Sequence, residues 1–473
     1  MPVISYAGSS PQVKFTQFKN IPWLYYSYAD DEIVLKVDYR EGWGYKLMTF
    51  RFPDRLALDI SFKTGVPEDY NPKEGFPVWE NIELPPHFVL TDLNASVDEE
   101  GMRVSVSSTF PLEYEPFFDE GNNQLIIRIP LVYKQEEKKQ ISDGLEYRLV
   151  EMANKSGPRR LHLLYIDTTA GRYFPGILTA KDFNRKLISA KDMATKSGSV
   201  CAVNGGFFSS DGNSQGLIIR NKRLLSYPKF DRPVFARTTD GKIHIGYLPF
   251  HGELHGPNGN IFSFDVVDST PKSREVALLT PGHPSRLSSN LTGSKIVIRD
   301  NVVEQVTTEN VTDKKWRYIL WSPTLRDDFK NLKVGDRVEL EFGLGISDIE
   351  IESAIGGGPM LVANGKADVG KQDEFKNDIM LGRAPRTGVG ITKDGLMILA
   401  VLEGRNPLSS IGGTLTEFAE LLREYGAYSA MNLDGGASSA MIIGNEQMSL
   451  SITGSRGISN VLAIFDMMET GVF

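Results

Sequence analysis

The segment TLTEFAELLREYGAYSAMNLDGGASS, residues 414–439, decides the fold. Thr414 and Glu417 form the S/T-x-x-E pattern of a capped helix start, and apolar residues three and four apart predict a helix over 415–425. A strand-like apolar run follows and ends at Asp434, which stands directly before two glycines. A helix that leads into a strand and a glycine-rich turn indicates a domain that mixes both kinds of element.

The N-terminal part of the chain has a different pattern. Short apolar or alternating runs fill most of residues 1–134, and helical patterns are nearly absent there, which predicts a small all-β domain. A run of charged residues then predicts a linker over 135–148. Residues 149–473 combine strands with a few helices, including hairpins that turn at 364–365 and 394–395. The predicted fold class is therefore α+β, a mixed, strand-rich domain with a few helices, preceded by the all-β domain.

Composition excludes several classes of protein. The chain has 473 residues, 41% of them hydrophobic and 24% charged, which excludes a wholly disordered chain. A net charge of −8 argues against a nucleic-acid partner. The only cysteine, Cys201, lies in an apolar run and is expected to be a core residue, so intramolecular disulfides and zinc sites built from several cysteines are excluded. No apolar run is long enough for a transmembrane segment.

Several familiar catalytic patterns are incomplete. Residues 436–440 partly resemble the G-x-S-x-G nucleophile elbow, but the last glycine is missing and no histidine follows the serine. The phosphate-loop pattern is absent, which disfavours a cytoplasmic nucleotide enzyme. His251 and His255 have the spacing of zinc ligands on a helix, but the neighbouring glycines and prolines favour a loop with two ordinary histidines.

Four glycine-rich segments are candidate ligand loops: 204–208, 355–360, 382–388 and 432–439. Glycine allows a close approach of the backbone and can turn N–H groups toward an anion. The third segment also contains two arginines, whose guanidinium groups suit phosphate oxygens. Each segment alone is explained more readily by a tight turn. Together they predict one site for an anionic ligand such as a phosphate ester.

The same segments, in the same order, resemble the phosphodiester glycosidase family. The matching stretches are VNGGFF (203–208), GGGPMLV (356–362), RAPRTGVG (383–390), EGR (403–405), TL (414–415), NLDGGASS (432–439) and SN (459–460). The similarity covers roughly residues 150–465. Two positions depart from the family pattern: Glu403 replaces the usual aspartate and Ala437 the usual glycine. Residues 52–60 resemble the AMIN-type domains of envelope proteins.

The resemblance implies hydrolysis of a sugar-1-phosphodiester, such as an N-acetylglucosamine-1-phosphodiester in a cell-envelope or exopolysaccharide glycan, with release of sugar and phosphomonoester. It implies catalytic roles for Asp434, Glu403 and Arg386. The substrate contacts that it implies come from Asn204, Gly205, Gly206, Gly357, Gly358, Arg383, Thr387, Arg405, Asn432, Gly435 and Ser438. The alternative is a non-catalytic binding protein for an anionic envelope glycan, because the departures at Glu403 and Ala437 affect the site itself.

Other expectations concern cofactors and location. No cofactor is required by any pattern, and a divalent cation such as calcium is left open because Asp434 and Glu403 are hard ligands. The expected partner is a glycan phosphodiester; neither a nucleic acid nor a transmembrane segment is expected, and the oligomeric state is open. The start of the sequence lacks a signal-peptide pattern. A secreted or cell-envelope protein whose signal is missing from this sequence is expected, with a cytoplasmic location as the alternative.

Overall fold

The computed structural model describes residues 14–72, 75–228, 232–247, 251–267, 270–271, 273–280, 291–311, 317–343, 350–369, 377–450 and 456–470. The chain forms two compact units. The N-terminal unit contains Met1–Glu136, Val150–Arg160 and Pro407–Ser410. The second unit contains Glu137–Leu149, Leu161–Asn406 and Ile411–Phe473. Two short later segments thus join the N-terminal unit, which a boundary drawn along the sequence did not anticipate.

The N-terminal unit is built from two antiparallel five-stranded sheets. In sheet order, the first contains β1 (Thr16–Gln17), β2 (Leu24–Tyr28), β3 (Glu32–Asp38), β10 (Gln124–Pro130) and β9 (Glu115–Asp119). The second contains β4 (Trp43–Phe50), β5 (Asp54–Phe62), β8 (Gly101–Ser108), β7 (Leu90–Val97) and β6 (Val78–Asn81). Alternate apolar residues of both sheets bury one face in a common core around Trp23 and Trp43.

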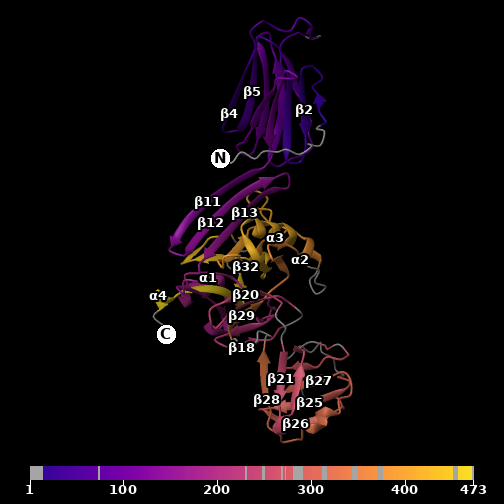
Figure 1. The fold of residues 1–473 in the computed structure, drawn as a ribbon, viewed down its shortest axis with the longest axis vertical. Coiled ribbons are helices and arrows are strands. Elements are labelled where there is room, and N and C mark those ends of the chain that lie inside the picture. Colours follow the sequence, from indigo (N-terminus) through magenta and orange to yellow (C-terminus); the bar gives the residue numbers. More distant parts are fainter. Residues whose placement is uncertain are drawn as a thin grey trace. The chain divides into compact units, whose positions relative to one another are not determined.

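The predicted linker is largely strand. Residues Tyr133–Ser142 form β11 and Leu145–Asn154 form β12, which are neighbours at one edge of an eight-stranded sheet (Figure 1). The side chains of residues 134–140 are exposed. A run of charged residues thus indicates that the side chains are exposed to solvent, but it does not show that the backbone is irregular. Charged side chains on an edge strand also discourage pairing with other chains.

The eight-stranded sheet is the framework of the second unit. Its order is β11, β12, β13 (Gly157–Ile166), β33 (Met397–Leu402), β32 (Arg386–Thr392), β34 (Ala427–Asn432), β30 (Met360–Ala363) and β31 (Lys366–Ala367). Both predicted hairpins are present, as β30–β31 and β32–β33. Helix α3 (Leu415–Glu424) packs on β30 and β34, and its Phe418 lies against Gly388 of β32.

Further sheets complete the second unit. One five-stranded sheet contains β14 (Tyr173–Thr179), β38 (Asn460–Asp466), β16 (Cys201–Asn204), β35 (Met441–Ile443) and β36 (Glu446–Gln447). Another contains β18 (Arg223–Ser226), β17 (Ile218–Arg220), β29 (Ile351–Gly356), β19 (Val234–Thr238) and β20 (Ile243–Gly246). Apolar residues from these two sheets and from the eight-stranded sheet share one core, which includes Val203, Ile355 and Val389. Cys201 lies in this core as expected, and burial raises the pKa of its thiol.

Three smaller sheets belong to the same unit. They are the pair β15 (Ile188–Ser189) and β37 (Gly457–Ile458); β22 (Ile261–Phe264), β21 (His251–His255) and β28 (Glu339–Gly343); and β23 (Val266–Val267), β24 (Ala277–Leu279), β27 (Tyr318–Ser322), β25 (Ser294–Arg299) and β26 (Val302–Thr307). The expectation of a loop around His251 and His255 is wrong, because both residues lie in strand β21. Leu254, Phe262 and Phe264 supply the buried alternate positions that stabilise this strand.

Helices are few and short. Besides α3, the chain forms α1 (Ala190–Ser197), α2 (Asn377–Leu381), α4 (Met467–Thr470) and the 3₁₀ turns η1 (Ala180–Phe183), η2 (Pro257–Gly259), η3 (Asp328–Asn331) and η4 (Gly436–Ser438). The capping box predicted for α3 is confirmed, since Thr414 and Glu417 bond each other's main-chain N–H groups. In the part of the chain that the structure describes, no helix has the length and apolar character needed to cross a bilayer.

Candidate active site

Antiparallel pairing brings three predicted site residues to one edge of the eight-stranded sheet. Strand β32 lies between β33 and β34 and is antiparallel to both, so the start of β32 lies beside the ends of both neighbours. Arg386 begins β32 and pairs with Leu402, which Glu403 follows. Asn432 ends β34 and pairs with Gly388. The loop that starts at Asp434 therefore leaves the sheet beside the start of β32.

Asn204, at the end of β16, connects this edge to the neighbouring sheet. Its side-chain nitrogen donates to the main-chain oxygen of Asp434 at 2.6 Å. Its side-chain oxygen accepts from the Thr387 hydroxyl at 2.7 Å and from the Ala440 N–H at 3.0 Å. Asn204 is 1% exposed. The side chain thus joins the two sheets, and the polar groups of Asn204 and Thr387, which the resemblance implied as substrate contacts, form hydrogen bonds within the protein.

Asp434 carries a strongly perturbed carboxyl. The main-chain N–H of Gly435 donates to its Oδ1 at 3.0 Å. Although the residue keeps some exposed surface, the surrounding protein desolvates the carboxyl and raises its pKa to about 6. A hydrogen bond from Ser438, the Gly435 N–H and the charge of Arg456 oppose this rise. A carboxyl that changes protonation near neutral pH is suited to accept a proton during a reaction.

Arg386 is a buried cation without a carboxylate partner among the described residues. Its side chain is held by the carbonyl oxygens of Gly413, Ile379 and Gly382 at 2.6–3.0 Å. Burial, and then the charge of Arg405, lower its pKa to about 10. Three carbonyl dipoles orient a guanidinium but do not neutralise it. Among the described residues no carboxylate offsets this charge, and the residue is only 3% exposed.

The other two predicted arginines have different surroundings. Arg405 has a left-handed backbone, with φ 62°, and its guanidinium lies near Gly436 in the Asp434 loop. Arg383 is exposed and forms two hydrogen bonds with Glu417, at 2.7 and 2.9 Å. Arg405 thus joins the site. Arg383 does not, because the acidic residue of the α3 capping box already binds it.

Glu403 lies in a buried hydrogen-bond chain. Its Oε1 is 2.9 Å from His162 Nε2 and accepts from the main-chain N–H of Leu450 at 2.7 Å. The Tyr147 hydroxyl lies 2.8 Å from the other ring nitrogen of His162. Glu403 is 4% exposed and His162 1%. The carboxylate is thus oriented from behind by a histidine and a tyrosine that the sequence analysis did not single out.

The predicted glycines serve close packing rather than an anion cradle. The N–H groups of Gly205 and Gly206 donate to Asn460, that of Gly357 to Pro233, and that of Gly358 to Asn432. A Cβ atom on Gly205 would lie 2.1 Å from the Asn460 side chain, and one on Gly357 2.4 Å from the Asn432 carbonyl. The expectation that these amides face an anion is wrong, because tight strand contacts consume them.

Two buried polar atoms near the Asp434 loop lack a hydrogen-bond partner. They are the side-chain oxygen of Asn432 and the hydroxyl of Ser439. The side-chain nitrogen of Asn432 donates to the main-chain oxygens of Gly358 and Leu433. Unpaired buried polar atoms are costly and are typical of sites that are completed by water or a ligand.

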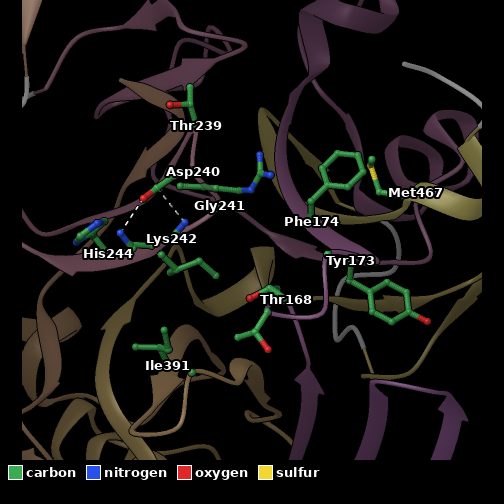
Figure 2. Close-up of a pocket in the computed structure, with 15 residues that line it drawn as sticks. Thr168, Tyr173, Phe174, Thr239, Asp240, Gly241, Lys242, His244, Ile391 and Met467 are labelled. Atoms are coloured by element: carbon green, nitrogen blue, oxygen red, sulfur yellow. Dashed lines mark hydrogen bonds and ion pairs between the residues drawn. The ribbon is translucent and has the colours of Figure 1, made fainter. Parts of the chain in front are cut away.

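The cavity beside Glu403 is small. It is lined by Pro385, Val401, Glu403, Gly436, Ala437, Ser439 and Leu450, and its volume is about 10 Å³. A much wider cleft of about 580 Å³ is lined by residues that include Phe174, Lys242 and Met467 (Figure 2). Ile391, which also lines it, is five residues along β32 from Arg386, or roughly 17 Å at 3.3 Å per residue. The wide cleft is therefore separate from the predicted site.

The wide cleft has mixed chemistry. Asp240 and Lys242 form a 2.8 Å ion pair on one side, and Phe174 and Met467 lie on the other (Figure 2). Arg237, which also lines the cleft, forms an ion pair with Glu352, so the carboxylate, ammonium and guanidinium groups of the cleft are already paired. We therefore place the candidate active site at the Asp434 loop, where charged groups are buried and incompletely neutralised.

Comparison with known families bears on the same region. The sequence model of a family described as phosphodiester glycosidase matches residues 292–465. This segment of the chain is similar to the phosphodiester glycosidase family. The phosphodiester glycosidase segment contains Arg386, Glu403 and Asp434, whereas Asn204 lies outside it. The match supports a glycosidase-type function in general. No protein with a curated description matches the chain.

Solved structures are similar to this chain at low identity. A hypothetical protein from Synechocystis is 16% identical, with 89% of this chain and 80% of that chain covered and a TM-score of 0.57. A candidate exported protein from Burkholderia pseudomallei K96243 is 16% identical over 90% and 97% of the two chains, with a TM-score of 0.47. The catalytic domain of zebrafish N-acetylglucosamine-1-phosphodiester alpha-N-acetylglucosaminidase, auto-inhibited by its pro-peptide, is 16% identical over 76% and 89%, with a TM-score of 0.40. Only the first supports a shared fold.

Sequence reasoning missed three residues of the candidate site. His162 and Tyr147 orient Glu403, and the positive charge of Arg456 acts on Asp434. Two of them carry a signal in the sequence. His162 is the only polar residue within the apolar run 161–166 apart from a tyrosine, and Arg456 lies between Gly454 and Gly457 in a further glycine-containing stretch. Tyr147 carries no such signal.

Proposed function

We propose that this protein hydrolyses a sugar-1-phosphodiester and releases the sugar and a phosphomonoester. The single observation that carries the proposal is the arrangement around the Asp434 loop. A carboxyl with a pKa of about 6 lies in the same loop as Gly435, whose Cβ position would be 3.9 Å from the Cα of the buried cation Arg386. The main chain of the Asp434 loop thus approaches the start of β32, and we propose that the Asp434 carboxyl and the Arg386 guanidinium serve the same ligand.

The proposed reaction breaks the bond between the anomeric carbon and a phosphate oxygen. The electron pair of that bond goes to the phosphate oxygen, and the sugar passes through an oxocarbenium-like transition state. A water molecule supplies the oxygen that replaces phosphate at the carbon, and the Asp434 carboxylate takes its proton. A phosphomonoester has a second pKa near 6, so the leaving group needs charge stabilisation more than it needs a general acid.

Arg386 and Arg405 supply this stabilisation in the proposal. Arg386 is fixed by three carbonyl groups, so little reorganisation is needed when negative charge grows on the leaving phosphate. Arg405 is exposed and lies at the Asp434 loop, where it can approach the same phosphate from solvent. Glu403, held by His162, is proposed to position the sugar rather than to react.

The proposed sugar is N-acetylglucosamine or a close relative, and the proposed source is an envelope or exopolysaccharide glycan outside the cytoplasm. The support for both is the resemblance of the site segments to the phosphodiester glycosidase family. Asp434 and Glu403 are also hard oxygen ligands, but each already accepts hydrogen bonds from the protein, so the proposed reaction uses no metal ion.

The test is turnover of a synthetic N-acetylglucosamine-1-phosphodiester by the full chain. Asp434→Asn keeps the size of the side chain and the bond from Gly435, but it removes the proton acceptor. We expect release of phosphomonoester by the unaltered chain and a loss of roughly 100-fold or more in the variant, while phosphate binding is retained. Asp394→Asn, in the β32–β33 turn, is the matched control. Equal rates in Asp434→Asn and the control would contradict the proposal.

One observation favours a second candidate function, the binding of an anionic glycan without turnover. The cavity beside Glu403 has a volume of only about 10 Å³, which is too small for a sugar ring. Under this alternative the ligand contacts the arginines from outside, and Asp434 takes no proton. Saturable binding of the synthetic diester, without turnover by the unaltered chain, would support it.

A further inference from the structure

A cluster of possible metal ligands lies on the small sheet β22–β21–β28, away from the Asp434 loop. In β21 Gly252 is buried and the side chain of Leu254 faces the core, whereas His251, Glu253 and His255 alternate with them and face outward. The spacing that we interpreted as a loop with two ordinary histidines is thus a strand that presents two histidines and a glutamate on one face.

The pairing of β21 with β28 adds a second carboxylate to this face. Glu253 pairs directly with Glu341, and His255 pairs with Glu339. Like charges placed directly opposite each other across two strands are destabilising. Neither Glu253 nor Glu341 has a lysine or arginine partner among the described residues. The repulsion between these two carboxylates therefore lacks a fixed cation to offset it.

His255 lies between the two carboxylates. Its Nε2 is 2.8 Å from Glu253 Oε2 and 3.4 Å from Glu341 Oε2. All three ligand atoms lie within 4.8 Å of one another. Nε2 carries at most one hydrogen, so it can satisfy only one of the carboxylates. Ligands about 2.0 Å from a tetrahedral zinc ion lie roughly 3.3 Å apart, which is close to the observed spacing.

His251 lies on the same outer face of β21. It pairs with Gly343, and a Cβ atom at Gly343 would lie 2.3 Å from the imidazole ring of His251. The missing side chain at Gly343 thus makes room for the ring on the same face as the cluster. His251 lies outside the group of ligand atoms within 4.8 Å of one another, so it is a neighbour on this face; the group itself offers the mixture of nitrogen and oxygen donors that zinc accepts.

We propose that Glu253, His255 and Glu341 bind a divalent transition-metal ion of the zinc class on the outer face of β21 and β28. The three side chains supply one imidazole nitrogen and two carboxylate oxygens, and the remaining position is open to water. The ion replaces the missing cation between Glu253 and Glu341 and joins the two strands. This site is independent of the proposed hydrolysis.

The test is zinc binding by the full chain, without an affinity tag, after removal of metal with a chelator. We expect one zinc ion per chain by calorimetry and by mass spectrometry, together with a rise in Tm. His255→Gln and Glu341→Gln should each weaken this binding by roughly tenfold or more. Glu446→Gln changes a glutamate on another short strand and should leave the affinity unchanged.

The competing explanation is that His255 only forms a hydrogen bond with Glu253 and that the cluster binds no ion. It predicts no stoichiometric zinc binding at micromolar concentration, or weak binding that His255→Gln and Glu341→Gln do not change; either result overturns the proposal. Glu253→Gln, with circular dichroism as a check of folding, provides a third variant if one of the others does not fold. The diester hydrolysis assay is a separate readout, so failure of the zinc site and failure of the proposed function are distinguishable.

Discussion

The side-chain nitrogen of Asn204 donates to the main-chain oxygen of Asp434 at 2.6 Å, although 230 residues separate the two in sequence. The Asp434 N–H in turn donates to the carbonyl of Gly205, the next residue after Asn204, at 3.0 Å. The end of β16 and the loop after β34 are thus joined by bonds in both directions. This tie fixes the position of the Asp434 carboxyl relative to the sheet edge where Arg386 begins β32.

Removal of the Asn204 side chain should therefore affect both stability and activity. Asn204→Ala leaves the Thr387 hydroxyl and the Ala440 N–H buried without partners, so we expect a loss of about 2–3 kcal/mol in the free energy of unfolding. We expect hydrolysis to fall as well, because the Asp434 loop loses its anchor. Urea denaturation and the diester assay measure the two effects. Asn213→Ala, at an exposed turn, is the control, and a variant as stable as this control would refute the tie.

Arg386 and Arg383 should respond differently to the same substitution. Arg386→Met should weaken the binding of inorganic phosphate roughly tenfold or more, because charge-assisted hydrogen bonds are lost. Its free energy of unfolding should fall by about 1–3 kcal/mol, because the carbonyls of Gly413, Ile379 and Gly382 lose their donor. Arg383→Met should keep phosphate affinity, because Glu417 already binds this side chain. Calorimetric titration with phosphate makes the comparison, and equal losses in both variants would remove Arg386 from the site.

Activity should depend on the protonation of Asp434. Its pKa is raised from the ordinary 3.8 to about 6, so the carboxyl is mostly protonated below pH 6 and mostly ionised above it. If Asp434 accepts a proton in the reaction, kcat/KM should fall about tenfold for each pH unit below this value. A pH–rate profile with the synthetic diester checks this. A flat profile between pH 5 and about 7 would exclude Asp434 as the base.

The same raised pKa affects stability with a definite sign. Between about pH 4 and 6 the unfolded chain has lost this proton while the folded chain retains it. Asp434 therefore lowers the free energy of unfolding as the pH rises through this window, and the effect is absent below it. Asp434→Asn should be relatively more stable than the unaltered chain at pH 7 than at pH 4. Thermal unfolding at both values measures the difference, and a constant difference would show that the carboxyl is not perturbed.

The buried chain behind Glu403 gives a graded prediction. His162→Phe leaves a carboxylate oxygen of Glu403 with one fewer partner in a site that is 4% exposed, so we expect a loss of about 1–3 kcal/mol. Tyr147→Phe removes only the hydroxyl bond to the ring and should cost about 1 kcal/mol. Chemical denaturation gives both values. A larger loss for Tyr147→Phe than for His162→Phe would contradict the proposed hydrogen-bond series, in which His162 contacts Glu403 directly and Tyr147 contacts only the histidine.

Local sequence determined the elements that depend on neighbouring residues. Helix α3 is found within one residue of its predicted end, because the capping box and its apolar face act over a few residues. The hairpins β30–β31 and β32–β33 also follow from their own turn residues. The strand around His251 was not predicted because only two of its five residues, Gly252 and Leu254, are buried, which gives too short an alternating pattern. Pairing with β22 and β28 holds this segment as a strand.

The sequence by itself determined which segments are candidates for the site, because glycines, arginines and strand ends are visible in their order along the chain. It did not determine what these groups face. Only the tertiary structure decided that the amides of Gly205 and Gly357 bond to protein, that Arg383 bonds to Glu417, and that Arg386 keeps an unneutralised charge. The reason is physical: a hydrogen-bond partner from a distant strand is set by strand order and packing, which residue type alone does not specify.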